Sequence, residues 1–279
     1  MWLGIIFGTI ALENIVLIAY FPLYFISLKH YRRVTEFAGQ KLWPWLIFTL
    51  ERLGEFKITL YSDDILPPTD KNIFLMMNHQ HWCDFVCGFY VAHVRGRLGA
   101  MKGFVKESIV YVPVVGTALK AMGFVFLTRN WDVDQRTLDR AFQSLRQGDA
   151  FWLFTHPEGS RYDPRKLKSS HEFAEKRGLP VLHHILLPRV KGFSKTIASI
   201  EKDLSAIYDV TIAYEAPPAS IPRMARGPWF ATGQARRIDI YLRRYPMESL
   251  PKSEEELGEW LYERYPMESL PKSEEELGE

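Results

Sequence analysis

The stretch "KNIFLMMNHQHWCD" (residues 71–84) decides the fold, because an apolar run passes directly into a cluster of reactive side chains. The run 71–77 has the length and composition of a buried strand. The segment "DFVCGFYVAHV" (84–94) that follows has the apolar spacing of a helix. A buried strand that leads into a helix is typical of an α/β fold, and here the connection carries two histidines, a cysteine and an aspartate.

The rest of the chain alternates in the same way. Apolar runs predict further strands at 57–64, 150–156, 181–188, 207–215 and 236–246. Amphipathic spacing predicts helices at 134–148 and 166–178, each closed by a glycine. Between 103 and 130, Pro113 and Gly116 interrupt an apolar run and predict strand, turn, short helix and strand. We therefore predict an α/β domain with a mixed, largely buried sheet flanked by helices.

Composition narrows the class of protein. The chain has 279 residues, of which 47% are apolar, so it has enough material for one large core. A net charge of +2 gives no overall preference for a polyanionic partner. Cys83 and Cys87 are four positions apart in one predicted helix, which suits no disulfide framework and indicates a reducing compartment.

The first 28 residues predict an N-terminal transmembrane helix. They contain a single charged residue, Glu13, and as a helix they would run about 40 Å, against a hydrocarbon core of about 30 Å. No basic region precedes the run and no cleavage site follows it, so we expect a retained anchor and not a signal peptide. A long buried core helix is the alternative. The basic cluster Lys29–Arg33 predicts that the rest of the chain lies on the cytosolic side.

Four further segments complete the predicted organisation. Residues 29–54 are expected at the membrane interface, because "LWPWLIFTL" (42–50) is too short to span and Trp43 and Trp45 suit the headgroup level. The main domain covers 55–215, and a C-terminal strand and helix occupy 216–264. The remaining 265–279 is expected to be a disordered tail. The segment "RYPMESLPKSEEELGE" occurs at 244–259 and again, letter for letter, at 264–279, and two identical copies do not make a solenoid.

The first candidate site lies in the heptapeptide itself. His79 and Asp84 are five positions apart, or about 140° around an ideal helix, so they could not cooperate from the middle of one helix. If the strand ends at Asn78, His79 lies in the turn and Asp84 in the first helical turn. The carboxylate then folds back toward the imidazole, which is the arrangement of a general base with an orienting partner.

Three alternatives stay open on these residues alone. A metal site from His79, His81, Cys83 and Asp84 would need ligands that converge from adjacent positions. Cys83 could act as an acyl-enzyme nucleophile, although buried helical cysteines are usually inert. A capped helix start with incidental histidines is the plainest possibility, and we leave His81 there.

Basic residues follow other predicted strands. The carboxyl ends of strands in an open α/β sheet converge on one crevice, where guanidinium groups bind phosphate bidentately and a glycine allows close backbone approach. Residues of these types at predicted strand ends are Arg129, Glu158, Gly159, Arg161, Arg189 and Lys191.

Four blocks in this order carry a resemblance to a known family. NHxxxxD (78–84), "FLTR", "PEGSR" and "LLPRVKGF" together resemble the PlsC-like glycerophospholipid acyltransferases over about 55–215. "RNWDVDQRTL" and "AIYDVT" are most similar to the eukaryotic lysophosphatidic acid acyltransferases, and "RYPMESLPKSEEEL" resembles the lysocardiolipin and lysophosphatidylinositol acyltransferases. The chain departs from the family pattern at His156, where an aromatic or aliphatic residue is usual, and at Ser160, where threonine is usual.

The resemblance implies roles for these residues. His79 would be the general base and Asp84 its partner, while Pro188 would shape the acyl-donor side. The glycerol phosphate of the acceptor would be bound by Arg129, Glu158, Gly159 and Arg161. Acyl-CoA would be a co-substrate, with no metal, no cofactor and no covalent enzyme intermediate, in keeping with the absence of a GxSxG motif.

The implied reaction is acylation of lysophosphatidic acid to phosphatidic acid in phospholipid biosynthesis. Acylation of lysophosphatidylinositol or lysocardiolipin is the alternative within the family. A catalytically silent lipid-binding membrane protein is the alternative outside it. The expected partners are the lysophospholipid, acyl-CoA and a membrane, with no nucleic acid. The expected location is the endoplasmic reticulum or another endomembrane, with the catalytic domain in the cytosol.

Overall fold

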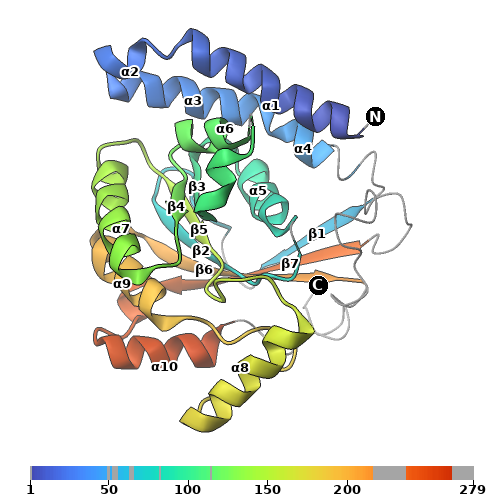
Figure 1. Cartoon of the computed structure of the whole chain (residues 1–279), viewed down its shortest axis with the longest axis vertical. Coiled ribbons are helices and arrows are strands. Elements are labelled where there is room, and N and C mark those ends of the chain that lie inside the picture. The colour runs from blue at the N-terminus through green and yellow to red at the C-terminus, as the bar shows by residue number, and fades with distance from the viewer. Residues whose placement is uncertain are drawn as a thin grey trace.

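The computed structural model describes residues 2–48, 51, 56–62, 66–81, 83–113, 115–215 and 237–265. Figure 1 shows a central sheet with helices on both of its faces. The strands are β1 (Lys57–Ser62), β2 (Ile73–Met77), β3 (Met101–Lys106), β4 (Val125–Leu127), β5 (Trp152–Thr155), β6 (Ala206–Tyr214) and β7 (Arg237–Pro246). The helices are α1 (Trp2–Ala19), α2 (Leu23–Ile26), α3 (Leu28–Leu42), α4 (Pro44–Phe48), α5 (Asp84–Val94), α6 (Val115–Ala121), α7 (Trp131–Arg146), α8 (Pro164–Arg177), α9 (Val190–Ile200) and α10 (Glu254–Arg264).

The seven strands form one mixed sheet in the order β1-β7-β6-β2-β5-β3-β4. Strands β6, β2, β5, β3 and β4 run parallel to one another. Strand β7 is antiparallel to β6 and parallel to β1. The predicted mixed, largely buried sheet is therefore confirmed, and the carboxyl ends of five of its strands lie at one edge.

Strand β2 shows why the sheet is buried on both faces. All five of its residues are inaccessible to solvent, and they alternate between two cores. Ile73, Leu75 and Met77 pack into the core that includes α4 and α5. Phe74 and Met76 pack into the core that includes α7, α9 and α10. A strand with apolar residues at every position suits the centre of a parallel sheet covered by helices.

The predicted continuous helix over 1–28 is not found. Helix α1 ends at Ala19, a turn follows, and Pro22 precedes the four-residue helix α2. Helix α1, which has 18 residues, packs against α3, α4 and α6. No helix in the described part of the chain is long and apolar enough to cross a membrane.

A buried polar pair joins α1 to the segment that follows α3. Glu13 is inaccessible to solvent, and its Oε2 accepts a 2.8 Å hydrogen bond from the indole Nε1 of Trp43. Trp43 also stacks on Phe89 of α5, with 4.5 Å between ring centroids. The expected headgroup position is therefore wrong for Trp43, which is a core residue, whereas Trp45 is 50% exposed.

The C-terminal part agrees with the prediction of a strand and a helix. Strand β7 fills the predicted range 236–246 except for its first residue, and Ser253 caps α10 by accepting a hydrogen bond from the Glu256 amide. Tyr265, assigned above to the tail, is buried. The predicted disorder of 266–279 falls outside the described residues, as do 216–236.

One predicted strand is absent, and the helices α3, α4 and α9 were not predicted. Residues 181–188 form an irregular segment in which Leu182, Ile185 and Leu186 are buried. Their uneven spacing suits packing onto the core and not the alternation of a strand. Helix α9 (Val190–Ile200) follows directly, with Arg189 as its N-cap residue.

Candidate active site

The site lies at the sheet edge where the parallel strands end. His79 comes two positions after β2, Arg129 two positions after β4, and His156 directly after β5. Because β2, β5, β3 and β4 are parallel neighbours, the three segments that follow β2, β4 and β5 meet at one edge. Figure 1 shows this edge beside the start of α5 and above α8. The convergence predicted for these strand ends is confirmed, except that Arg189 follows an irregular segment.

His79 and Asp84 form the predicted pair. The Nδ1 atom of His79 lies 2.9 Å from Oδ2 of Asp84. Strand β2 ends at Met77 and α5 begins at Asp84, so the fold-back of the carboxylate onto the turn takes place as expected. The carboxylate is fully buried, and the imidazole keeps 21% of its side chain exposed.

Three donors hold the Asp84 carboxylate. Besides His79, the amide of His81 donates to Oδ2 at 2.8 Å and the hydroxyl of Tyr214 donates to Oδ1 at 2.5 Å. Burial raises the pKa of Asp84, while the hydrogen bonds from Tyr214 and the His81 amide act in the opposite direction. Tyr214 was not predicted as a site residue, because it lies 130 positions away at the end of β6.

This geometry assigns the proton of His79. A carboxylate only accepts hydrogen bonds, so Nδ1 carries the proton and Nε2 keeps its lone pair. Burial lowers the pKa of His79 to about 3, and the nearby charges of Arg161, Lys166 and Arg129 contribute to this. The imidazole is therefore neutral and able to accept a proton at Nε2.

The backbone of His79 is held on both sides by the loop that follows β5. Its N–H donates to Oε1 of Glu158 at 2.8 Å, and its carbonyl accepts from the Tyr162 amide at 2.7 Å. Glu158 is 2% exposed, and burial raises its pKa to about 8. Glu158 thus holds the backbone of His79, and its role in binding the acceptor stays a prediction.

His156 packs directly against the candidate base. Its ring lies 4.0 Å from that of His79, centroid to centroid, with an angle of 16° between the planes. Its Nδ1 lies 3.0 Å from the Met77 carbonyl and 3.1 Å from the Asn78 carbonyl, so this nitrogen is the donor. The unusual histidine before "PEG" thus forms one wall of the site.

Arg129 occupies a strained loop that a carboxylate holds in place. Its φ is 69°, in the left-handed region that residues other than glycine rarely adopt. Its amide donates to Oδ2 of Asp134 at 2.8 Å, and the amide and hydroxyl of Thr128 donate to Oδ1. Such strain persists only where neighbouring groups impose it, and it clusters at functional sites.

A second cationic segment faces Arg129. Lys166 in α8 donates from Nζ to the Arg161 carbonyl at 3.2 Å. Partial burial and the charges of Arg129, Arg161 and Arg189 lower its pKa, and the charge of Asp163 acts in the opposite direction. Within the described ranges, no ion pair joins Arg129, Arg161 or Lys166 to a carboxylate. The cluster therefore has positive charge available for an anion, and Lys166 is a member that the sequence did not single out.

Gly159 allows the two cationic loops to approach each other. Its φ of 68° lies in the left-handed region, and a Cβ added there would lie 3.0 Å from Cδ and 3.1 Å from Nε of Arg189. The Arg189 amide donates to the Pro157 carbonyl at 2.8 Å, which holds the 186–189 segment against this loop. Pro188, predicted on the acyl-donor side, is buried in that segment.

The metal alternative fits this arrangement poorly. Ligand atoms of His79, Asp84 and His156 lie within 4.8 Å of one another. Both Nδ1 atoms are already engaged in hydrogen bonds, that of His79 with Asp84 and that of His156 with the carbonyls of Met77 and Asn78. A metal ion needs converging lone pairs, so binding one here would require these hydrogen bonds to break.

The thiol alternative is also disfavoured. Cys83 and Cys87 are buried, and burial raises the pKa of both thiols. A nucleophilic cysteine needs a lowered pKa and access to substrate. Cys83 instead packs within the wall of the site, with Sγ 3.1 Å from Nδ1 of His81.

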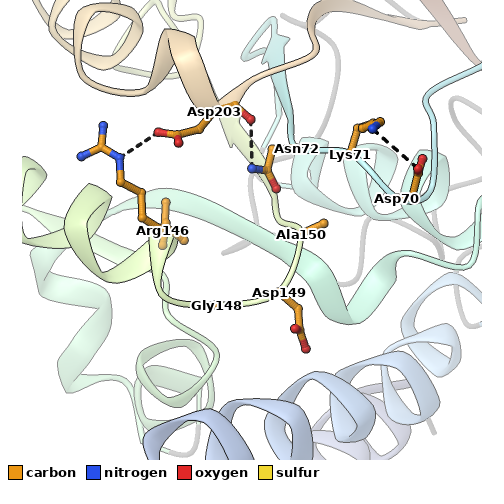
Figure 2. A pocket seen from close by; sticks show the side chains of 9 residues that line it. Asp70, Lys71, Asn72, Arg146, Gly148, Asp149, Ala150 and Asp203 are labelled. Carbon is orange, nitrogen blue, oxygen red and sulfur yellow. Dashed lines mark hydrogen bonds and ion pairs between the residues drawn. The ribbon is translucent and has the colours of Figure 1, made fainter.

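A polar cavity of about 290 Å³ lies at the opposite end of the strands. Figure 2 shows it beside Asn72 and Ala150, which precede β2 and β5. Its charges are paired: Arg146 contacts Asp203 at 2.8 Å, and the Asp203 carbonyl accepts from Asn72. None of the candidate residues lines this cavity. Its ion pair and hydrogen bond join segments at the end of the strands opposite the candidate site.

Comparison with known proteins assigns the family. A family model described as Acyltransferase matches residues 57–215, more than half of the chain. This chain belongs to the acyltransferase family. A second model, described as Acyltransferase C-terminus, matches residues 230–266 of this family member. The blocks that carry His79, Arg129, Glu158 and Pro188 all lie inside the first match.

Named relatives of this acyltransferase-family protein include two at 30% identity. The 1-acyl-sn-glycerol-3-phosphate acyltransferase 2 of Brassica oleracea aligns over 84% of this chain and 60% of its own length. The 1-acyl-sn-glycerol-3-phosphate acyltransferase delta of Bos taurus aligns over 93% of this chain and 66% of its own. The chain thus spans about two thirds of these relatives or less. The solved structure of the 1-acyl-sn-glycerophosphate acyltransferase PlsC from Thermotoga maritima superposes with a TM-score of 0.46 at 18% identity, covering 90% of this chain and 92% of that chain.

Proposed function

We propose that this acyltransferase-family protein transfers the acyl group of acyl-CoA to lysophosphatidic acid and releases phosphatidic acid and CoA. The supporting observation is the neutral His79 imidazole, which is held by the buried Asp84 carboxylate and lies within electrostatic reach of three cations, Arg161, Lys166 and Arg129. A phosphate bound by these cations would bring the free hydroxyl of a lysophospholipid close to Nε2. The relatives named for this reaction support the choice of acceptor.

The proposed step is direct acyl transfer. Nε2 of His79 takes the proton from the acceptor hydroxyl as its oxygen attacks the thioester carbonyl. The imidazolium that forms is stabilised by Asp84 through Nδ1–H. Collapse of the tetrahedral intermediate breaks the carbon–sulfur bond, and His79 returns its proton to the leaving sulfur of CoA. Each proton is thus accounted for without a further base.

The cations would select the acceptor by its charge. A phosphomonoester carries about two negative charges near neutral pH, whereas a phosphodiester such as that of lysophosphatidylinositol carries one. Arg129, Arg161 and Lys166 suit the more highly charged group, since Arg binds phosphate oxygens bidentately. Lysophosphatidic acid is therefore the proposed acceptor, with lysophosphatidylinositol and lysocardiolipin as the competing acceptors.

A thiol-release assay tests the reaction. Purified protein with one acyl-CoA should release CoA fastest with lysophosphatidic acid, in a comparison with lysophosphatidylinositol, lysocardiolipin and lysophosphatidylcholine. His79→Asn serves as the matched inactive control. A higher rate with lysophosphatidylinositol or lysocardiolipin would replace the proposed acceptor. Absence of CoA release with every acceptor would favour the silent lipid-binding alternative.

The substrate is a lipid, and the N-terminal helices offer a surface for one. The side chains of Ile15, Ile18, Phe25 and Ile26 are 63%, 70%, 76% and 78% exposed. Figure 1 places α1–α3 on one side of the sheet and α8 on the other. We propose that this apolar surface docks on the cytosolic face of a membrane, and residence at the endoplasmic reticulum stays a prediction.

Vesicle flotation tests the docking surface. Phe25→Ser with Ile26→Ser should abolish co-flotation with phosphatidylcholine vesicles, because the transfer of these two side chains into lipid would be lost. Phe173→Ser is the matched control, since this aromatic residue is 46% exposed on α8. Equal flotation of the double variant and the wild type would show that another surface binds the membrane.

A further inference from the structure

The chain continues past the main domain and returns to the active site at Tyr265. This residue follows α10 as its C-cap, and it is 1% exposed. Its hydroxyl lies 2.8 Å from the Met77 carbonyl and 3.3 Å from Oε1 of Glu158. Both acceptors belong to the frame of the site: Met77 ends β2, and Glu158 lies in the loop that holds the base.

A continuous set of contacts then leads to the base. The same Oε1 of Glu158 that lies 3.3 Å from the Tyr265 hydroxyl also accepts the N–H of His79 at 2.8 Å. The Met77 carbonyl that accepts from Tyr265 also accepts from Nδ1 of His156, whose ring stacks on His79. Tyr265 thus shares Oε1 of Glu158 with the His79 amide, and it shares the Met77 carbonyl with His156, whose ring stacks on the candidate base.

We infer that Tyr265, the C-cap residue of α10, is a positioning residue for acyl transfer. This inference rests on the proposed function for its kinetic consequence. The hydroxyl donates to the end of β2 and lies against the Glu158 carboxyl group, and these two groups hold the His79 backbone from which the imidazole reaches Asp84. Neither the main-domain match at 57–215 nor its four sequence blocks contain this residue.

The repeated segment supplies a matched control. Tyr265 is the second residue of the second copy of "RYPMESLPKSEEELGE", and Tyr245 holds the same place in the first copy. Tyr245 lies in β7 and packs edge-on against Trp260, with ring centroids 5.0 Å apart. The two tyrosines therefore have identical sequence on their C-terminal side, but Tyr265 contacts Glu158 whereas Tyr245 packs on Trp260.

The first test measures the hydrogen bond from the His79 amide to Glu158 directly. In Tyr265→Phe, the amide of His79 should exchange with deuterium at least about tenfold faster, because its acceptor Glu158 loses a fixed position. Tyr245→Phe should leave this exchange unchanged. Equal protection of residues 78–83 in wild type and Tyr265→Phe would overturn the inference, whether or not the protein proves to be an enzyme.

The second test measures turnover. Tyr265→Phe should lower kcat roughly tenfold with little change in KM for acyl-CoA, since small displacements of a base cost up to about a hundredfold. Tyr245→Phe should stay near wild type. Because both act on Glu158, Tyr265→Phe should add little to Glu158→Gln. A wild type without activity refutes the proposed function, whereas an active wild type with unchanged Tyr265→Phe, or full additivity with Glu158→Gln, refutes the role of Tyr265.

Discussion

The imidazole of His156 lies parallel to that of His79, with 4.0 Å between the ring centroids. The contact limits rotation of the His79 ring about its side-chain bonds, and the two carbonyls that accept from Nδ1 of His156 keep the second ring in place. The base is therefore held from two directions, by a carboxylate at its edge and by a ring on its face.

Substitutions at His156 should distinguish the effect of the stacked ring on activity from the effect of its hydrogen-bonding nitrogen. His156→Phe keeps the stacked ring and should retain activity within about threefold, whereas His156→Ala should lower kcat roughly tenfold because the His79 ring is freed. Steady-state kinetics at matched folding, checked by thermal melting, distinguish the two. Equal impairment of both variants would show that the imidazole nitrogen, and not the ring contact, matters.

The base pair itself should dominate catalysis. His79→Asn or Asp84→Asn should lower kcat about a hundredfold or more, the usual contribution of a general base. The double variant should be scarcely worse than His79→Asn, because the two residues act as one unit. His81→Asn is the control, since it is the backbone amide of His81 that donates to Asp84. Near-full activity of His79→Asn would rule out the proposed mechanism.

Lys166 should contribute to binding of the acceptor. Lys166→Met keeps the apolar stem and removes the charge, so KM for lysophosphatidic acid should rise about tenfold, the scale of one charge-assisted hydrogen bond. KM for acyl-CoA should not change. Lys168→Met removes a charge from the same helix and should have little effect. If the two variants behaved alike, the effect would come from overall charge and not from a phosphate contact.

The pH dependence of turnover should depend on bound substrate. Because burial and the neighbouring cations lower the pKa of His79 to about 3, the free enzyme keeps a neutral base far below the usual histidine range. A bound phosphate offsets the charges of Arg161, Lys166 and Arg129, so it should raise this pKa. The acid limb of kcat should thus lie at higher pH than that of kcat/KM, after correction for ionisation of the free lipid. Coincident limbs would contradict this account.

Glu13 should make stability decline with pH. Burial raises its pKa from 4.5 to about 7, so the folded protein keeps a proton that the unfolded chain has lost between these values. The free energy of unfolding therefore falls as the pH rises from 4.5 to about 7. Glu13→Gln stays neutral and can still accept from Trp43, so its Tm should fall less between pH 5 and pH 8. Parallel Tm curves for the two proteins would show that Glu13 is not titrating in the folded state.

Local sequence predicted the parts of the site that lie close together in the chain. The fold-back of Asp84 onto His79 follows from where β2 ends and α5 begins, and both boundaries are visible in residues 71–94. The convergence of Arg129 with these residues follows from the parallel order of the strands.

The residues that were missed lie far away in the chain. Tyr214 reaches Asp84 only because β6 pairs with β2, and Tyr265 reaches Glu158 only because α10 docks under the sheet. No periodicity within either segment indicates such a contact. The interruption of the predicted helix over 1–28 has a local cause, because a turn follows Ala19 and Pro22 precedes α2.

The place of β1 in the sheet has a consequence for how the protein is made. β1 lies at the edge of the described sheet and pairs with β7 alone, about 175 residues later in the chain. At synthesis rates of roughly 5–20 residues per second, β1 waits roughly 10 to 35 s on the ribosome for its partner. Until then the nascent chain has an unpaired β1 and an open edge at β6, and unpaired edges of this kind invite association with other chains. The emerging protein therefore depends on protection of these two strands until β7 has left the ribosome and closed the sheet.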